Sequence, residues 1–220
     1  MCGRFVAAST RDLLVDWFGV EEIADRQVLA PNYNVAPTDD VYNVTGDGDR
    51  RRLRISSWGL TVGDGRQSPL INARAETLTE RPLFRDAFEH RRCLIPADGF
   101  YEWETLAGGR KQPYLFFPAE GRPVGLAGLY GRRGTCAIVT GAARPPVARL
   151  HDRMPVVIAP DRWDVWLDRA ATVDELHALL VPPPNAPFDV RPVSPRVNDV
   201  RNNDAGLLDE SPPPEPLHLF

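Results

Sequence analysis

Short β-like runs, separated by glycine or proline, constrain the fold of this sequence more than any other feature. Valine, isoleucine, leucine and aromatic residues gather in these runs, and Gly or Pro interrupts nearly every gap between them. The pattern predicts many short strands in a mainly antiparallel, barrel-like sheet. The strands are expected at residues 42–44, 52–58, 92–95, 100–104, 114–117, 124–130, 135–140, 156–158 and 189–193.

Helical patterns lie before, between and after these runs and predict an α+β fold. The first begins at Thr10 and ends before Gly19, with apolar residues at helical spacing between them. Further helices are expected at residues 83–88, 162–168 and 173–180. Thr172 and Glu175 have the spacing of a capping box, which marks the start of the last helix.

The length of 220 residues suits one domain with a sizeable core. We expect this domain to span residues 1–203, with helices flanking the β core. Residues 211–216 read Ser-Pro-Pro-Pro-Glu-Pro, so residues 204–220 are expected to form a loose, Pro-rich C-terminal tail.

Composition and charge exclude several classes of protein. The formal net charge of −4 argues against a protein that coats duplex nucleic acid. All basic residues except Lys111 are arginines, however, and arginine suits bidentate phosphate contacts, so a local basic groove stays compatible with the sequence. No apolar run of eighteen residues and no signal-peptide pattern occurs, so we expect no membrane partner and a cytoplasmic location.

The cysteines and histidines do not form a metal-binding or disulfide pattern. Cys2, Cys93 and Cys136 contain no C-x-x-C pair, and the four histidines lack paired ligand spacing. Nucleotide-binding and hydrolase motifs such as G-x-x-x-x-G-K-[ST] and G-x-S-x-G are also missing. We therefore expect no metal and no cofactor. Cys93 and Cys136 lie in β-like runs and are expected to be buried.

Cys2 differs from the other two cysteines by its position. Removal of Met1 would make it a free N-terminal cysteine, in which an amine and a thiol lie on adjacent carbons. Reference pKa values of about 8 and 8.5 bring both groups within reach of neutral pH. The amine can form an imine with an aldehyde, and the thiol can then close a five-membered ring on the same carbon. The position alone also fits an arbitrary second residue.

Six short strings, in order, decide between these interpretations. They are M-C-G-R-F at residues 1–5, Y-N-V-A-P at 33–37, I-N-A-R-A-E-T at 71–77, A-D-G-F-Y-E-W at 97–103, K-Q-P-Y at 111–114 and H-D-R-M-P at 151–155. Each string is weak alone, but together they resemble the SRAP (SOS-response-associated peptidase) family from residue 1 to about residue 203. The resemblance implies an SRAP-like fold.

The resemblance also implies a specific activity. SRAP proteins crosslink to abasic sites in single-stranded DNA through a thiazolidine on the N-terminal cysteine, and they carry an autoproteolytic, peptidase-like activity that removes the preceding residue. The expected partner is therefore single-stranded DNA with an abasic site, bound by a monomer. The protein would be associated with the nucleoid when it is bound to damaged DNA.

The resemblance assigns catalytic roles to four residues: Cys2 as the nucleophile, Asn72 as a neutral group that orients the sugar or the N-terminus, Glu102 as a proton shuttle, and His151 as an acid or base in opening the sugar ring. Without the strings, Asn72 fits a turn cap, Glu102 an outward-facing strand residue and His151 a structural histidine.

The residues expected to bind DNA are Arg4, Asn34, Trp58, Arg74, Arg81, Thr140 and Arg153. Asn34 is expected to shape the pocket floor, and Trp58 also fits a core position. One departure affects the expected grip on DNA: Asp64 and Gly65 stand where the family often has tryptophans that stack on bases. Stacking contributes about 1–3 kcal/mol per base, so the departure predicts weaker or differently built binding.

Two alternatives stay open at this point. A thiol peptidase acting on protein substrates would use Cys2 as nucleophile with His151 or Glu102 as base. A non-covalent single-strand-binding module would bind undamaged strands, in a salt-sensitive way and without need of Cys2.

Overall fold

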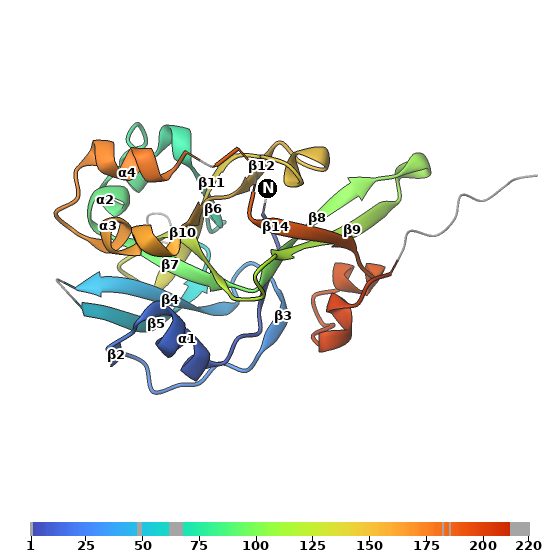
Figure 1. Cartoon of the computed structure of the whole chain (residues 1–220), viewed down its shortest axis with the longest axis horizontal. Coiled ribbons are helices and arrows are strands. Elements are labelled where there is room, and N and C mark those ends of the chain that lie inside the picture. Colours follow the sequence, from blue (N-terminus) through green and yellow to red (C-terminus); the bar gives the residue numbers. More distant parts are fainter. Residues whose placement is uncertain (1, 48–49, 62–67, 182, 185, 212–220) are drawn as a thin grey trace, which may run out of the picture.

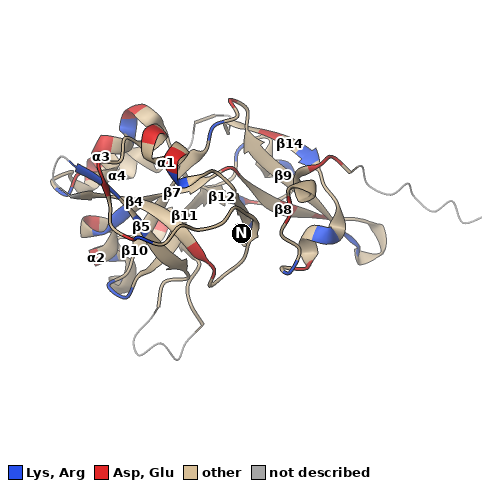
Figure 2. Ribbon diagram, turned by 90° about the horizontal axis from the view of Figure 1, so that it is seen from below, with Lys and Arg blue, Asp and Glu red and all other residues tan. Residues whose placement is uncertain are grey.

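Two β-sheets form the body of the protein, and helices cover one end of it (Figure 1). The computed structural model describes residues 2–47, 50–61, 68–181, 183–184 and 186–211. Helices α2, α3 and α4 lie at one end of the molecule and strands β8, β9 and β14 at the other (Figures 1 and 2).

The smaller sheet is antiparallel throughout and contains the beginning of the chain. β1 lies between β3 and β8, so the N-terminal segment is covered on both edges. The strand order is β14 (Phe188–Pro192), β9 (Lys111–Pro118), β8 (Gly99–Thr105), β1 (Phe5–Ala7) and β3 (Asn32–Val35).

The larger sheet curls into a partly closed ring. Its order is β12 (Arg153–Pro155), β11 (Thr135–Ala142), β10 (Val124–Tyr130), β7 (Arg92–Ala97), β4 (Asp40–Asp47), β5 (Arg50–Trp58) and β2 (Glu22–Ile23). β13 (Val157–Ile158) pairs with β10, and β6 (Asn72–Arg74) pairs with β11. β11 also pairs in parallel with β5, although β10, β7 and β4 lie between them in this order, and this pairing closes part of the ring. The predicted mainly antiparallel α+β fold is confirmed, and its barrel-like character is partial.

The described residues form four α-helices, and the first and last of them begin at the side-chain caps that the sequence predicts. They are α1 (Arg11–Phe18), α2 (Pro82–His90), α3 (Trp163–Leu167) and α4 (Val173–Leu179). The Thr10 side chain accepts a hydrogen bond from the Leu13 N–H, and Gly19 ends α1 at a φ of 60°, which favours glycine. The predicted capping box of Thr172 and Glu175 is present at α4.

A buried arginine joins α2 and α3 to the sheet. The Arg92 guanidinium, on β7, donates to the backbone oxygens of Phe88 and Glu89 at 2.6 Å each and of Trp166 at 2.8 Å, and also to that of Asp168. These carbonyls lie in the last turns of the two helices or just beyond, where backbone acceptors lack helical partners. Arg92 therefore fixes the helical layer through charge-assisted hydrogen bonds.

The body of the fold continues beyond the expected end of the domain. Leu207 is fully buried with Val193 and Val197, and an isolated bridge pairs Val193 with Glu210. Residues 204–211 are thus packed, although the sequence places them in a loose tail. The division into a domain and a tail stays a prediction, although these contacts show that the packed part of the chain extends at least to Glu210. Residues 212–220 of the expected tail lie outside the described residues.

Candidate active site

Cys2 lies three residues before β1 of the smaller sheet, in the apolar cluster between the two sheets. Its side chain is fully buried, and the same cluster contains Phe5, Trp58 and Phe100. Burial raises the pKa of the Cys2 thiol well above its ordinary range, and the nearby Glu102 carboxyl acts in the same direction. At neutral pH the sulfur is therefore protonated in this state.

Asn72 reaches Cys2 from the larger sheet. β6 runs parallel to β11, with Asn72 opposite Ile138, and this places the amide at the seam between the sheets. The Asn72 Nδ2 donates to the Cys2 backbone oxygen at 2.8 Å. Its Oδ1 is buried and has no hydrogen-bond partner among the described residues. A buried acceptor without a partner is unfavourable, so this oxygen is available to a donor that enters the site.

Glu102 lies on β8 and is the predicted acid of the group around Cys2. Its side chain is buried, although it stands on a strand where a glutamate would ordinarily face solvent. Burial raises the pKa of the Glu102 carboxyl, and the nearby His151 opposes part of this shift. A raised pKa favours the neutral acid, which can donate a proton at a pH where an exposed glutamate cannot.

His151 lies on the more open side of the group, in the segment between residue 149 and β12. Its side chain is 30% exposed, whereas Cys2 and Glu102 are buried. The His151 Nδ1 lies 2.8 Å from the Asp152 carboxylate and 2.9 Å from the Arg153 N–H. The neutral ring can accept from Arg153, and the protonated ring can donate to Asp152. The structure thus brings Cys2, Asn72, Glu102 and His151 together from four separate segments.

The four arginines of the predicted DNA contact set differ in their exposure and in their protein partners. Arg74 and Arg81 are exposed. Arg153 donates to both carboxylate oxygens of Glu76, at 2.6 and 2.9 Å, and these hydrogen bonds lower the pKa of the Glu76 carboxyl. Arg4 is half-buried and donates to the Asn34 Oδ1 at 2.7 Å. A phosphate would meet Arg74 and Arg81 directly, but it would have to compete with carboxylate or amide partners for the other two.

Three residues of the predicted contact set are buried, and their contact with DNA stays a prediction. Trp58 is fully buried and donates through Nε1 to the Ile71 oxygen at 3.0 Å. The Asn34 Nδ2 donates to the Asn202 oxygen at 2.9 Å and to other backbone oxygens of the C-terminal segment. Thr140 is fully buried beneath Arg153. Asp64 and Gly65 lie outside the described residues.

The sequence interpretation missed two carboxylates that hold predicted residues in place. Glu76 pairs with Arg153, and Asp152 contacts His151. Both lie inside the strings that identified their neighbours, but spacing along the chain does not show which carboxylate faces which cation. Only the pairing of β6 and β12 with β11 brings Glu76 and Arg153 to the same place.

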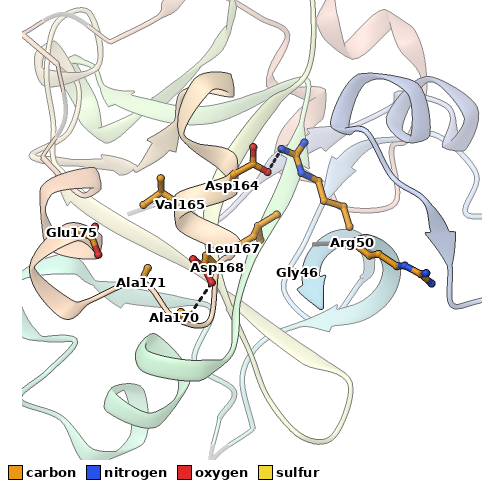
Figure 3. A pocket seen from close by; sticks show the side chains of 10 residues that line it. Gly46, Arg50, Asp164, Val165, Leu167, Asp168, Ala170, Ala171 and Glu175 are labelled. Carbon is orange, nitrogen blue, oxygen red and sulfur yellow. Dashed lines mark hydrogen bonds and ion pairs between the residues drawn. The ribbon is translucent and has the colours of Figure 1, made fainter. Parts of the chain in front are cut away.

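A cavity of about 750 Å³ lies elsewhere, between the α3–α4 region and the hairpin of β4 and β5 (Figure 3). None of the predicted site residues lines it. Arg51 and Asp164 pair across it at 2.6 Å, so much of its charge is already compensated. This cavity is therefore not the site built around Cys2.

Basic and acidic residues alternate along the ribbon in Figure 2, for the part of the chain that is described. Within the described residues, no three His, Cys, Asp or Glu side chains are grouped to hold a metal ion. No described helix is long and apolar enough to span a membrane.

Comparison with known proteins identifies the family. The family model described as SOS response associated peptidase (SRAP) matches residues 1–200. The chain belongs to the SRAP family. The abasic site processing protein YoaM of Bacillus subtilis is 36% identical over 222 residues, which cover 95% of this chain and 98% of YoaM.

Two further SRAP comparisons extend this result. The abasic site processing protein YedK of Escherichia coli is 32% identical, over 94% of this chain and 99% of YedK. A crystal structure of a Bacteroides thetaiotaomicron protein superimposes with a TM-score of 0.82 at 21% identity, over 96% of this chain and all of that chain, and so supports the overall fold.

Proposed function

We propose that this SRAP protein processes abasic sites by crosslinking covalently to single-stranded DNA through Cys2. The observation that carries the proposal is the convergence of the Cys2 thiol, the Asn72 amide, the buried Glu102 carboxyl and the His151 ring. The names of YoaM and YedK support the same substrate. On this proposal the protein acts as a monomer in DNA repair, in the cytoplasm and at the nucleoid when damaged DNA is bound.

The first step frees the amine of Cys2. Hydrolysis of the peptide bond between Met1 and Cys2 consumes one water and releases methionine. We propose that the site itself performs this hydrolysis, which would be its peptidase-like activity. The family name supports an activity of this kind. Retention of Met1 in Glu102→Gln or Asn72→Leu protein, read by intact mass, would support it; complete processing in both variants would contradict it.

The second step forms the ring. The Cys2 amine adds to the sugar aldehyde, and loss of one water gives an imine. The sulfur then adds to the imine carbon while the thiol proton reaches the nitrogen, which closes the thiazolidine. The neutral Glu102 donates the proton that lets the hydroxyl leave as water, and His151 exchanges protons when the sugar ring opens. Asn72 holds the Cys2 backbone in place through its hydrogen bond to the Cys2 oxygen.

A gel assay tests the proposal directly. Single-stranded DNA with one abasic site is incubated with the protein, and a denaturing gel separates adduct from free strand. We expect an adduct with the wild type and none with Cys2→Ala, because the alanine variant keeps the fold but has no thiol to close the ring. Undamaged DNA of the same sequence is the substrate control. An adduct of undiminished stability in Cys2→Ala would overturn the thiazolidine mechanism.

The same experiment separates the two alternatives. A thiol peptidase that attacks other chains needs the Cys2 thiolate but not a free α-amine, whereas the thiazolidine needs both. A variant with one additional residue before Cys2 that is not removed should therefore lose the DNA adduct and keep any such peptidase activity. A non-covalent module would bind undamaged strands equally well and would give no adduct with any variant.

A further inference from the structure

The turn between β7 and β8 contains a carboxylate that holds the N-terminal segment. The Asp98 Oδ2 accepts the backbone N–H groups of Ala8, at 2.6 Å, and Ser9, at 2.8 Å. The Ser9 hydroxyl donates to the other carboxylate oxygen, and the Asp98 N–H donates to the Val6 oxygen at 2.8 Å. Charge-assisted hydrogen bonds of this kind are stronger than those between neutral groups.

β1 needs such an anchor because its strand pairing alone fixes its register weakly. The strand has only three residues, and its pairing with β3 shifts register between Phe5 and Ala7. Toward β8, only Phe5 and Val6 pair, with Phe100 and Gly99. A slip by one residue would turn every side chain of the strand to the opposite face.

The position of the turn is itself well determined. An added Cβ at Gly99 would lie 2.6 Å from the Phe116 backbone oxygen, so the turn approaches β9 closely. The Ser9 hydroxyl distinguishes the observed register from its neighbours. A slip that brought Ala8 to this place would offer no hydroxyl, and a slip that brought Thr10 there would remove the N-cap of α1. Asp98 is therefore held by the sheet and in turn holds residues 8 and 9.

The same register brings Cys2 to the acid. The Tyr101 N–H donates to the Arg4 oxygen at 3.0 Å, which continues the β1–β8 alignment toward the N-terminus. Continued by one more residue, the alignment places Glu102 level with Gly3, beside Cys2. Asp98 and Glu102 belong to one turn and strand, so the anchor and the acid are parts of a single rigid element.

We propose that Asp98 is a positioning residue that holds β1 in the register in which Cys2 meets Asn72 and Glu102. Its consequence for DNA crosslinking rests on the proposed function, but its effect on the position of Cys2 does not. Loss of the anchor should release Cys2 from the seam and expose a thiol that is otherwise fully buried.

Alkylation of the three cysteines tests the position of Cys2 without DNA. Native protein is treated with iodoacetamide, and peptide mass mapping gives a rate for each cysteine. We expect Asp98→Asn to speed alkylation of Cys2 about tenfold, the factor that corresponds to the loss of one strong hydrogen bond. Cys93 and Cys136 are also fully buried and distant in sequence, so they report general loosening of the fold and should not change.

Two neighbouring variants complete the design. Ser9→Ala removes only the hydroxyl contact and should have the same effect in smaller degree, with little risk to folding. Thr10→Ala removes the cap of α1 next to the anchor without touching Asp98, and should leave the Cys2 rate unchanged. Equal acceleration at all three cysteines in Asp98→Asn and Ser9→Ala, or an unchanged Cys2 rate in both, would overturn the proposal.

The DNA assay then connects the anchor to activity. In Asp98→Asn the rate of adduct formation should fall about tenfold while alkylation of Cys2 rises, and a merely unstable variant would not give these opposite changes. Unchanged adduct formation together with faster alkylation would overturn the catalytic part of the inference. If the wild type forms no adduct but Asp98→Asn still exposes Cys2 selectively, the proposed function fails and the positioning role stands.

Discussion

Burial has opposite consequences for the polar groups in two regions of this protein. On the helical side, the Arg92 guanidinium is surrounded by backbone oxygens that accept its hydrogen bonds. On the other side of the ring, burial raises the pKa of the Glu102 carboxyl and leaves the Asn72 Oδ1 without a partner among the described residues. A buried group whose hydrogen bonds are all made stabilises a fold. A buried acceptor without a partner, such as the Asn72 Oδ1, is unfavourable until a donor enters the site.

The largest effect on stability is expected at Arg92, whose hydrogen bonds are made. Arg92→Met should lower the free energy of unfolding by about 2–4 kcal/mol, because several backbone oxygens lose their donor while staying buried. Chemical denaturation at neutral pH measures this change. Arg51→Met is the matched control, since Arg51 also donates to a backbone oxygen but at the partly exposed edge of the cavity in Figure 3, and it should change stability less. If Arg92→Met lowered the free energy of unfolding no more than Arg51→Met, the stabilising role of Arg92 would be contradicted.

At Glu102 the main effect should be on the rate of adduct formation. Glu102→Gln should slow adduct formation about a hundredfold, a factor typical of the loss of a general acid, because the amide keeps the shape but cannot donate a carboxyl proton. Single-turnover gel kinetics with abasic single-stranded DNA measure it. Glu104→Gln, two residues further along β8, is the control on the same strand. A rate within a factor of two of the wild type would remove Glu102 from the mechanism.

The pH dependence of stability sharpens the same contrast. The Glu102 pKa is raised in the folded state. The contribution of this carboxyl to the free energy of unfolding is therefore fully present below the unfolded pKa of about 4.3, and it is lost as pH rises through the folded pKa. Glu102→Gln lacks this loss. The stability of the variant relative to the wild type should therefore increase from pH 4 toward pH 8, as measured by denaturation at several pH values. A difference that is constant over this range would show that burial does not perturb the carboxyl.

The smallest effects are expected at the exposed arginines. Arg74→Gln and Arg81→Gln should each weaken binding of single-stranded DNA and reduce the slope of log K against log salt by about 0.7, if each contacts one phosphate. Fluorescence anisotropy over a salt series, with Cys2→Ala to prevent crosslinking, measures both quantities. Arg201→Gln is a control in which the exposed arginine already pairs with Asp199 at 2.7 Å. An unchanged slope in Arg74→Gln and Arg81→Gln would remove them from the contact set.

Local signals carried much of the fold. The Thr10 and Gly19 caps and the Thr172–Glu175 box marked helices that are present, and the punctuated β-like runs correspond to strands of the two sheets. The sequence did not indicate β1, β3, β6 or β12. These strands have only three or four residues and form because distant segments pair with them, so their own residues carry little periodicity.

The candidate site divides in the same way. Cys2 was chosen for the chemistry of an aminothiol, and Asn72, Glu102 and His151 for strings typical of the family. Trp58, Asn34 and Thr140 came from the same resemblance, and their side chains are buried. A string of letters identifies which residues matter; whether a side chain faces a strand of DNA or the core depends on packing against segments far away in the chain.

The sequence by itself thus determined the type of fold and the family and singled out Cys2 as the candidate nucleophile, because caps, turn residues and the aminothiol act within a few residues. Only the tertiary structure decided that the sulfur is buried, that the Glu102 carboxyl has a raised pKa, that Glu76 holds Arg153 and that Asp98 holds β1. These properties depend on burial and on contacts between distant segments, such as Glu76 with Arg153 and Asp98 with Ala8, which are 77 and 90 positions apart in the chain.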